Sequence, residues 1–294
     1  MIAVKLMGGL GNQMFQYAAA RRLANKHSAE LFLDLRWFDE IPKTDTPRFY
    51  ELGDYPIKAR LIDMFSVRLR SSNKRPTPLE RALHRTGADK RIWELGEPSA
   101  AFYPAVLRAS DNTYLLGWWQ NEKYFKDIRQ ILLKEFEPKT PPNTKNKKYL
   151  EKIKNSEAVS IHVRRDDYIT NKHANKFHGL TPIEYYQKAF GLIKGRVGSQ
   201  GLHLFVFSTD IDWCKKNLSF GTPMTFVEGN KKGSDDMSLM KHCKHNIMAN
   251  SSFSWWGAWL NKNPDKIVIA PKNWFQDPKA DSETEIVPDS WTRL

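Results

Sequence analysis

Cysteine is scarce in this chain of 294 residues, which contains only Cys214 and Cys243. Two cysteines are too few for the disulfide framework of a small secreted protein, and they lack the spacing of a metal site. We therefore expect two buried thiols in a reducing compartment and no structural metal.

Long apolar runs are also missing. No window of the sequence approaches the roughly 20 apolar residues that a membrane-spanning helix needs. The first apolar stretch, IAVKLM at 2–7, is too short for the core of a signal peptide and runs directly into Gly8. These absences predict a cytoplasmic protein, with peripheral contact at the inner membrane face as an option that a basic surface would suit.

Acidic residues are outnumbered by basic ones, 33 against 46, which gives a net charge of +13. Such an excess favours an anionic partner: nucleic acid, a phosphorylated ligand or an acidic membrane surface. Much of the excess lies in stretches such as 68–85 and 138–154, where a solvated face is the simpler interpretation. No helix-turn-helix, RNA-recognition or zinc-finger pattern accompanies the charge, so we expect no nucleic-acid partner.

A third glycine is missing from the turn GGLGNQMFQYA, which starts at Gly8 and follows the first apolar run. The layout resembles a dinucleotide fingerprint, and Asp34 lies about where a ribose-binding acid would. Met14, however, stands where a third glycine would let helix and strand pack closely. A partial G-x-G pattern is weak evidence, and we expect no nicotinamide or flavin site here.

Alternating strand and helix patterns fill most of the chain, and one stretch rich in proline and lysine, 137–148, interrupts them. Taken as a linker, this stretch gives an N-terminal domain of 1–140 and a C-terminal domain of 149–294. The predicted strands are 2–7, 29–35, 113–119, 158–163, 202–208, 224–228, 246–250 and 266–271. The first predicted helix begins near Met14, and further helices are predicted at 122–136, 182–194, 213–218 and 237–244. Such alternation implies a parallel sheet with helices on both faces.

Ligands of such sheets bind outside the carboxyl ends of the strands, so the residues at those ends are site candidates. The first strand after the linker ends as HVRRDDY, and period-two alternation puts His162 and Arg164 on one face. Arg164 or Arg165 can fork onto a diphosphate, because a planar guanidinium matches two phosphate oxygens. An ion pair of these arginines with Asp166 or Asp167 explains the residues equally well.

Two further strand ends carry polar residues. In FVFSTD, Ser208 and Asp210 end a strand; the carboxylate suits a guanine edge or a ribose, but a cap of the next helix is the simpler interpretation. In NIMANSSFSWWGAWL, Ser251, Ser252 and Ser254 join the free N–H groups of a helix start, which together make an anion site. The tryptophans of that helix are expected in the core.

Four segments, GGLGNQMFQYA, HVRRDDY, FSTD and NSSFSWWGAWLN, span nearly the whole chain. In order and spacing they resemble the inverting α-1,2-fucosyltransferases of the bacterial type. The resemblance implies the B-type glycosyltransferase fold, with two Rossmann-like domains facing across a cleft. It also implies transfer of L-fucose from GDP-L-fucose to the 2-hydroxyl of a terminal galactose, in an oligosaccharide or a lipid-linked glycan, with no metal or other cofactor.

The resemblance assigns the glycine turn to the first domain's side of the cleft. Gly9 and Gly11 would line it opposite the donor, and Asn12 and Gln13 would reach the fucose or the acceptor. The later stretch LLGWWQNEKYF is either a sugar-stacking surface or, as we favour, part of a buried strand.

In the second domain the resemblance assigns a donor site formed by His162, Arg164, Arg165, Ser208, Asp210, Ser251, Ser252, Phe253 and Ser254. Arg164 resembles the family's main diphosphate ligand, and Asp210 resembles its guanine contact. The family commonly has glycine where this chain has Asp166, and this departure puts the geometry of that loop in question.

The implied chemistry builds negative charge on the leaving phosphate, which Arg164 and the 251–254 turn would stabilise. Asp167 is the first candidate for the base that activates the acceptor hydroxyl, and His178 is the second. Asn12 could orient the acceptor but cannot act as a base. Two alternatives stay open: a GDP-sugar-binding protein without transferase activity, and a fucosyltransferase of another linkage.

Overall fold

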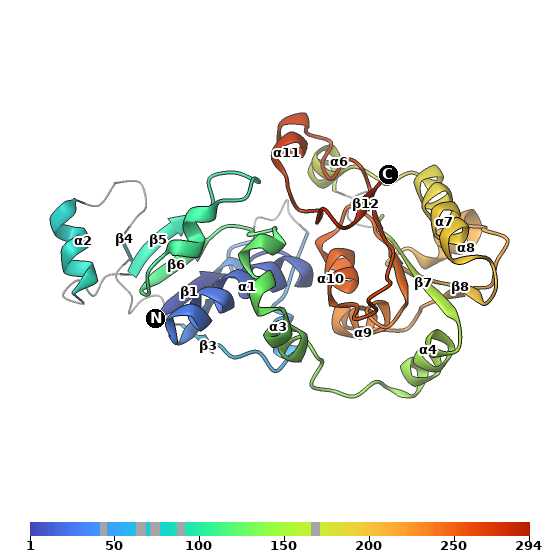
Figure 1. The fold of residues 1–294 in the computed structure, drawn as a ribbon, viewed down its shortest axis with the longest axis horizontal. Coiled ribbons are helices and arrows are strands. Elements are labelled where there is room, and N and C mark those ends of the chain that lie inside the picture. The colour runs from blue at the N-terminus through green and yellow to red at the C-terminus, as the bar shows by residue number, and fades with distance from the viewer. Residues whose placement is uncertain (42–45, 63–68, 71–76, 87–91, 166–170) are drawn as a thin grey trace. The chain divides into compact units, whose positions relative to one another are not determined.

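The computed structural model describes residues 1–41, 46–62, 69–70, 77–86, 92–165 and 171–294 (Figure 1). Its contacts divide the chain into two units: 1–41, 48–52 and 57–135 form the first, and 42–47, 53–56 and 136–294 the second. Each unit holds a six-stranded sheet. Within these described ranges, no helix combines the length and the apolar character needed to cross a bilayer.

The first unit has the strand order β3-β2-β1-β6-β5-β4, and all neighbours run parallel. Its strands are β1 Ile2–Lys5, β2 Leu31–Asp34, β3 Arg60–Leu61, β4 Leu69–Arg70, β5 Ile92–Gly96 and β6 Thr113–Leu116. Its α-helices in the described part are α1 Leu10–His27, α2 Pro78–Arg85 and α3 Arg129–Glu135. The strands predicted at 2–7, 29–35 and 113–119 are β1, β2 and β6.

Two helices of this unit differ from the prediction. Helix α1 begins at Leu10 rather than near Met14, because Gly8 turns the chain at φ 74° and Gly9 already takes the N-cap position. The predicted helix 122–136 is broken into two 3₁₀ turns followed by α3. Phe125 interrupts it, because its backbone at φ −149° lies outside the helical range.

The second unit has the order β12-β11-β10-β7-β8-β9, again parallel throughout. Its strands are β7 Glu157–Val163, β8 Leu202–Ser208, β9 Met224–Phe226, β10 His245–Ile247, β11 Val268–Ala270 and β12 Thr292–Arg293. Its described helices are α4 Thr144–Lys154, α6 Lys172–His178, α7 Ile183–Val197, α8 Ile211–Asn217, α9 Gly233–Met240, α10 Ser252–Leu260 and α11 Pro278–Glu283. Counted in chain order, these strands form the sequence 3-2-1-4-5-6 of a Rossmann fold.

Helices cover both faces of the second sheet (Figure 1). Val159 and Ile161 of β7 pack in one apolar cluster with Ile193 of α7. Ala158, on the opposite face of the same strand, packs in a second cluster with Leu239 of α9. The predicted period-two alternation of this strand is therefore confirmed, because Val159 and Ile161 pack on one face and Ala158 on the other.

The two cysteines and the tryptophans of α10 belong to this core. Cys214 and Cys243 are buried and free, and burial raises the pKa of the Cys214 thiol to about 11. Trp255, Trp256 and Trp259 are all buried. The predictions of buried thiols and core tryptophans are confirmed.

The predicted linker 137–148 is partly helical, since α4 begins at Thr144 and the Asn143 side chain caps it. The second unit begins earlier, at Phe136, whose ring packs edge-on against Trp256 with centroids 5.1 Å apart. Residues 53–56 also belong to it. Asp54 accepts hydrogen bonds from Lys232 Nζ at 2.6 Å and from Ser234 Oγ at 2.8 Å.

Candidate active site

Three predicted strand ends lie at one edge of the second sheet. Strand β7 lies between β8 and β10, with Val163 opposite Ser208 and Ile161 opposite Ile247. Because the strands are parallel, the segments that follow them emerge at the same edge. Strand order reverses between β7 and β10, which is where Rossmann-like sheets bind their ligands.

At the end of β7, His162 is buried and its ring lies 5.5 Å from the ring of Phe253, the second residue of α10. Arg164 and Arg165 follow, both half-buried. The structure therefore brings His162 and Phe253 together as neighbours. Asp166 and the first base candidate, Asp167, lie outside the described residues.

At the end of β8, Asp210 caps α8: its Oδ1 accepts from the backbone N–H of Trp213 at 3.2 Å. Ser208 Oγ in turn accepts from the backbone N–H of Asp210. The other carboxylate oxygen pairs with Arg165 Nε at 3.4 Å, and the guanidinium lies 3.7 Å from the centroid of the Trp213 ring. Asp210 is thus a helix cap and an ion-pair partner, and 35% of its side chain stays exposed.

At the end of β10, the residues of the predicted serine turn differ in burial: Ser251 and Ser254 are buried, and the two residues between them are half-exposed. The Ser251 hydroxyl caps α10 by accepting from the N–H of Phe253. The Ser254 hydroxyl is buried and donates to the carbonyls of Ala249 and Ser251. Only Ser252 and Phe253 of the four are half-exposed, so Ser254 has a structural position that differs from the predicted ligand contact.

Sequence reasoning missed Asn250, which ties another loop to this edge. Its Nδ2 donates to the carbonyls of His178 at 2.7 Å and Trp274 at 3.3 Å, and its Oδ1 accepts from Thr181 Oγ1 at 3.2 Å. The second base candidate, His178, ends α6 and lies beside Phe275, with ring centroids 5.5 Å apart. The sequence signal that could have identified Asn250 is its position as a polar residue shortly after a buried strand.

The glycine turn of the first unit is held by buried polar contacts. Gln13 is fully buried, and its amide donates to the carbonyls of Gly8 and Phe49 and accepts from the N–H of Glu51. Both amide hydrogens of Gln13 are therefore used inside the protein. This structural role differs from the predicted contact with fucose or acceptor.

The same turn is also a poor phosphate site, because a carboxylate of the chain already lies at the start of α1. Glu51 Oε2 accepts from the N–H of Leu10 at 3.1 Å, so the chain's own carboxylate occupies the α1 N-terminus where a dinucleotide would place its pyrophosphate. Gly11 is buried within α1, whereas Gly9 is half-exposed at the cap. Asn12 is half-buried, and its Oδ1 accepts from Gln120 Nε2 at 2.8 Å.

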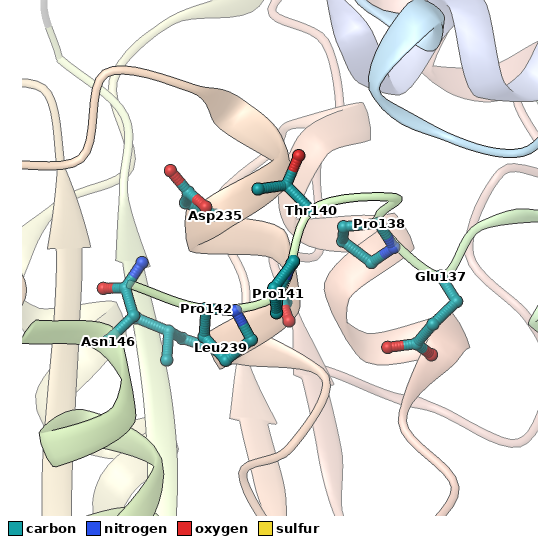
Figure 2. A pocket seen from close by; sticks show the side chains of 9 residues that line it. Glu137, Pro138, Thr140, Pro141, Pro142, Asn146, Asp235 and Leu239 are labelled. Carbon is teal, nitrogen blue, oxygen red and sulfur yellow. The ribbon is translucent and has the colours of Figure 1, made fainter. Parts of the chain in front are cut away.

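A pocket of about 100 Å³ lies apart from these strand ends, between the 137–142 stretch, α4 and α9 (Figure 2). Its lining includes Glu137, the ring of Pro141, Asn146 of α4 and Asp235 of α9. None of the predicted site residues lines it. In the described ranges no three His, Cys, Asp or Glu side chains are grouped so that they could hold a metal ion.

Comparison of the sequence with known proteins identifies the family of this chain. Residues 98–294 match the model of Glycosyl transferase family 11. The O-antigen biosynthesis glycosyltransferase WbnK of Escherichia coli is 35% identical, over 98% of this chain and 99% of that protein. An alpha-1,2-colitosyltransferase of Escherichia coli is 34% identical, over 100% and 98% of the two chains. Galactoside alpha-(1,2)-fucosyltransferase 2 of Pongo pygmaeus is 23% identical, over 91% and 71%.

The solved structure of the NodZ alpha-1,6-fucosyltransferase, soaked with GDP-fucose, superimposes with a TM-score of 0.50. It is 13% identical and covers 95% of this chain and 96% of its own. Identity this low establishes the fold alone. The predicted fold class, two Rossmann-like domains of the B-type glycosyltransferase fold, is confirmed.

Proposed function

Because the chain belongs to glycosyl transferase family 11, we propose that it transfers L-fucose from GDP-L-fucose to the 2-hydroxyl of a terminal galactose, with inversion and without a metal. One observation carries the proposal: the three donor motifs follow the neighbouring strands β8, β7 and β10 at one sheet edge. The acceptor would be a galactose-ended oligosaccharide or a lipid-linked glycan.

The leaving diphosphate would bind between the end of β7 and the start of α10. Arg164 follows β7, and the N-terminus of α10, which carries the partial positive charge of a helix start, follows β10 next to it. As the glycosidic bond breaks, negative charge grows on the β-phosphate while the sugar becomes oxocarbenium-like. A fixed guanidinium and oriented N–H groups lower that barrier without reorganising.

The guanine would be recognised at Asp210. A carboxylate can accept from two adjacent N–H groups of the guanine edge, and each of its oxygens has two lone pairs. The Trp213 N–H and Arg165 use one lone pair on each oxygen and hold the carboxylate in place. In this proposal Arg165 orients Asp210, while Arg164 binds phosphate.

The acceptor hydroxyl needs a base, for which Asp167 and His178 remain the two candidates. His178 is at the same edge as the donor loop, because Asn250 holds its carbonyl. Replacing the true base should lower kcat by about 10²–10⁴, whereas replacing the other should change it little. Comparing Asp167→Asn with His178→Asn therefore separates them.

A second candidate function comes from the colitosyltransferase relative, which is 34% identical along the whole chain. Colitose is the 3-deoxy analogue of L-fucose, so the two donors differ by one hydroxyl. A site that hydrogen-bonds this hydroxyl would reject the deoxy sugar strongly, whereas an apolar site would discriminate only weakly.

Purified protein offered GDP-L-fucose or GDP-colitose with terminal galactosides, with and without EDTA, tests the proposal. We expect an α-1,2-linked fucosyl product by NMR, formed equally well with EDTA. Transfer from GDP-colitose alone selects the second candidate. Calorimetric GDP binding without transfer identifies a GDP-sugar-binding protein, and another product linkage rejects the 2-hydroxyl.

A further inference from the structure

Two adjacent tryptophans after β6 have opposite environments. Trp119 is fully buried, whereas 44% of the neighbouring Trp118 is exposed. The chain adopts a strained backbone to achieve this, because Trp119 has φ 55°, a left-handed conformation that is unusual for a bulky residue. Strain of this kind persists only where surrounding contacts enforce it, and it is concentrated at functional sites.

The contact that enforces it is a carboxylate. Glu97 Oε2 accepts from the backbone N–H of Trp118 at 2.7 Å and of Trp119 at 3.0 Å. Gly117 allows the approach, since a Cβ there would lie 2.5 Å from the Cβ of Glu97. Burial raises the pKa of Glu97, so the chain keeps this acid in an unfavourable place to hold the turn. The turn presents the Trp118 indole outward.

The indole lies against the glycine turn that follows β1. A Cβ on Gly8 would come 3.2 Å from Cζ3 of Trp118 and equally close to the Cβ of Asn12, so only glycine fits between them. Beside the ring, Gln120 Nε2 donates to Asn12 Oδ1 at 2.8 Å. Within the described residues no other hydrogen bond engages these two side chains, which leaves the Asn12 NH₂ group and the Gln120 carbonyl for a ligand.

The position is also that of a ligand site. Strands β1 and β6 are neighbours in the centre of the first sheet, with Ile2 opposite Thr113 and Val4 opposite Leu115. Gly8 and Trp118 follow their carboxyl ends, where α/β sheets bind ligands. The group offers a flat apolar face and neutral amides, and the nearby α1 N-terminus is occupied by Glu51. It therefore suits an uncharged polyhydroxylated ring better than a phosphate.

We propose that Trp118, Asn12 and Gln120 form a subsite for one pyranose ring of the acceptor glycan. The indole would stack on the C–H face of the sugar while the two amides bind its hydroxyls. Galactose fits this chemistry, because its axial 4-hydroxyl leaves C3–H, C4–H and C5–H on one face. The identity of the sugar as acceptor rests on the proposed function; the subsite itself rests on these contacts.

The test labels the ten tryptophans of the full-length chain with 5-fluorotryptophan and assigns Trp118 in the ¹⁹F spectrum with Trp118→Phe. Methyl galactoside, glucoside and mannoside are titrated in the presence of GDP. We expect the galactoside to shift the Trp118 resonance. If none of the three sugars shifts it, the subsite is wrong, whether or not the protein transfers fucose.

Kinetics supply the second arm. We expect Trp118→Ala to raise the KM for a terminal galactoside by about tenfold or more, with Trp118→Phe recovering most of it and GDP affinity unchanged. Asn12→Ala should raise the same KM. Leu79→Ala, which shortens another exposed apolar side chain of the first unit, is the control and should change nothing.

The two proposals fail differently. A Trp118→Ala variant that keeps the parent's acceptor KM overturns the subsite and leaves the transferase function intact. A parent protein whose Trp118 resonance shifts with galactoside but which transfers neither sugar overturns the proposed function and leaves the subsite intact. A loss of thermal stability in Trp118→Ala without any change in sugar binding shows a purely structural role.

Discussion

The carboxyl edges of the two sheets differ in what the chain supplies to a helix that begins there. In the first unit, the Glu51 carboxylate accepts from the N–H of Leu10 at the start of α1. In the second unit, the neutral Ser251 hydroxyl caps α10, and Arg164 follows the neighbouring strand. The first edge thus carries a carboxylate at its helix start, and the second carries a guanidinium next to its helix start.

This difference shows that the sheet type does not decide the ligand. Both sheets are six-stranded and parallel, and both have polar residues at their central strand ends. The charge that the chain places at the helix start decides whether an anion or a neutral group is favoured there. Substitutions should therefore have different consequences at the two edges. At the first they should lower stability or acceptor affinity and leave GDP binding unchanged, and at the second they should lower donor binding or turnover.

The largest expected effect is at Arg164. Arg164→Ala should fold normally but lose on the order of 10²–10³ in turnover, the loss seen when one fixed donor to a developing oxyanion is removed. Arg164→Lys should recover part of the GDP affinity and little of the rate, because lysine lacks the two-pronged geometry. Turnover and calorimetric GDP affinity measure both. A turnover within about threefold of the parent, with lower thermal stability, would mean a structural ion pair.

Gln13 gives the opposite expectation at the first edge. Gln13→Ala leaves the Gly8 and Phe49 carbonyls and the Glu51 N–H without their partner, so the free energy of unfolding should fall by about 2–3 kcal/mol. Denaturant titration measures this fall. GDP affinity of the folded protein should not change, and a selective loss of GDP or acceptor binding at unchanged stability would restore the ligand contact that the sequence predicted.

Asp210 combines a structural contact, the cap of α8, with a proposed donor contact, so its substitution sharpens the comparison. Asp210→Ala should weaken GDP and GDP-fucose binding alike by about 1.5–3 kcal/mol, because a charge-assisted hydrogen bond to the base is lost. It should also cost about 1 kcal/mol of stability through loss of the α8 cap. Calorimetry and thermal unfolding separate the two losses. Unchanged GDP affinity with reduced stability would leave Asp210 as a cap and Arg165 partner only.

The smallest expected effect compares one acid from each unit, the fully buried Asp34 and the half-buried Asp236. In the first, Asp34 is buried and bound by Arg36 and Tyr114, and these hydrogen bonds lower its pKa. In the second, burial raises the pKa of Asp236 to about 6, against the opposing hydrogen bond from Asn230. The folded pKa of Asp236 exceeds the unfolded value, so ionisation of this carboxyl destabilises the folded protein. This destabilisation is absent at about pH 4 and grows until about pH 6.

Asp236→Asn should therefore stabilise the protein by about 1–2 kcal/mol at pH 7 and by almost nothing at pH 4. Denaturant titrations at the two pH values measure the difference. Asp34→Asn is the matched control and should destabilise at pH 7, because a lowered pKa means that the charged form contributes to stability. A pH-independent gain for Asp236→Asn would assign the effect to packing instead.

The sequence predicted most of the second unit and its site edge because the signals there are local. The apolar runs of β7 and β8 reflect burial on both faces. Asp210 lies three residues before the N–H that it caps. The three polar strand ends could therefore be assigned to one parallel sheet. The two-residue strands β3 and β4 were not predicted, because two residues carry no periodicity.

The roles that were missed depend on residues distant in sequence. Gln13 meets Phe49 and Glu51, more than 35 residues away, and Asn250 binds carbonyls 72 and 24 residues away. Sequence also favoured one buried environment for the stretch that contains Trp118 and Trp119. Glu97, 21 residues from Trp118, separates them by holding a turn that no local pattern reveals. Asp167 and the site of the unusual Asp166 lie outside the described residues.

The short excursion of residues 53–56 into the second unit has a consequence for synthesis. Asp54 leaves the ribosome early but binds Lys232 and Ser234, which are made about 180 residues later. Tyr55 likewise packs against Phe136, with ring centroids 5.9 Å apart. The nascent first unit must therefore keep this loop unsatisfied until most of the chain has emerged. A fragment ending at 140 would keep Phe136 beside Tyr55 but would lack the lysine and the serine that bind Asp54 in the whole chain.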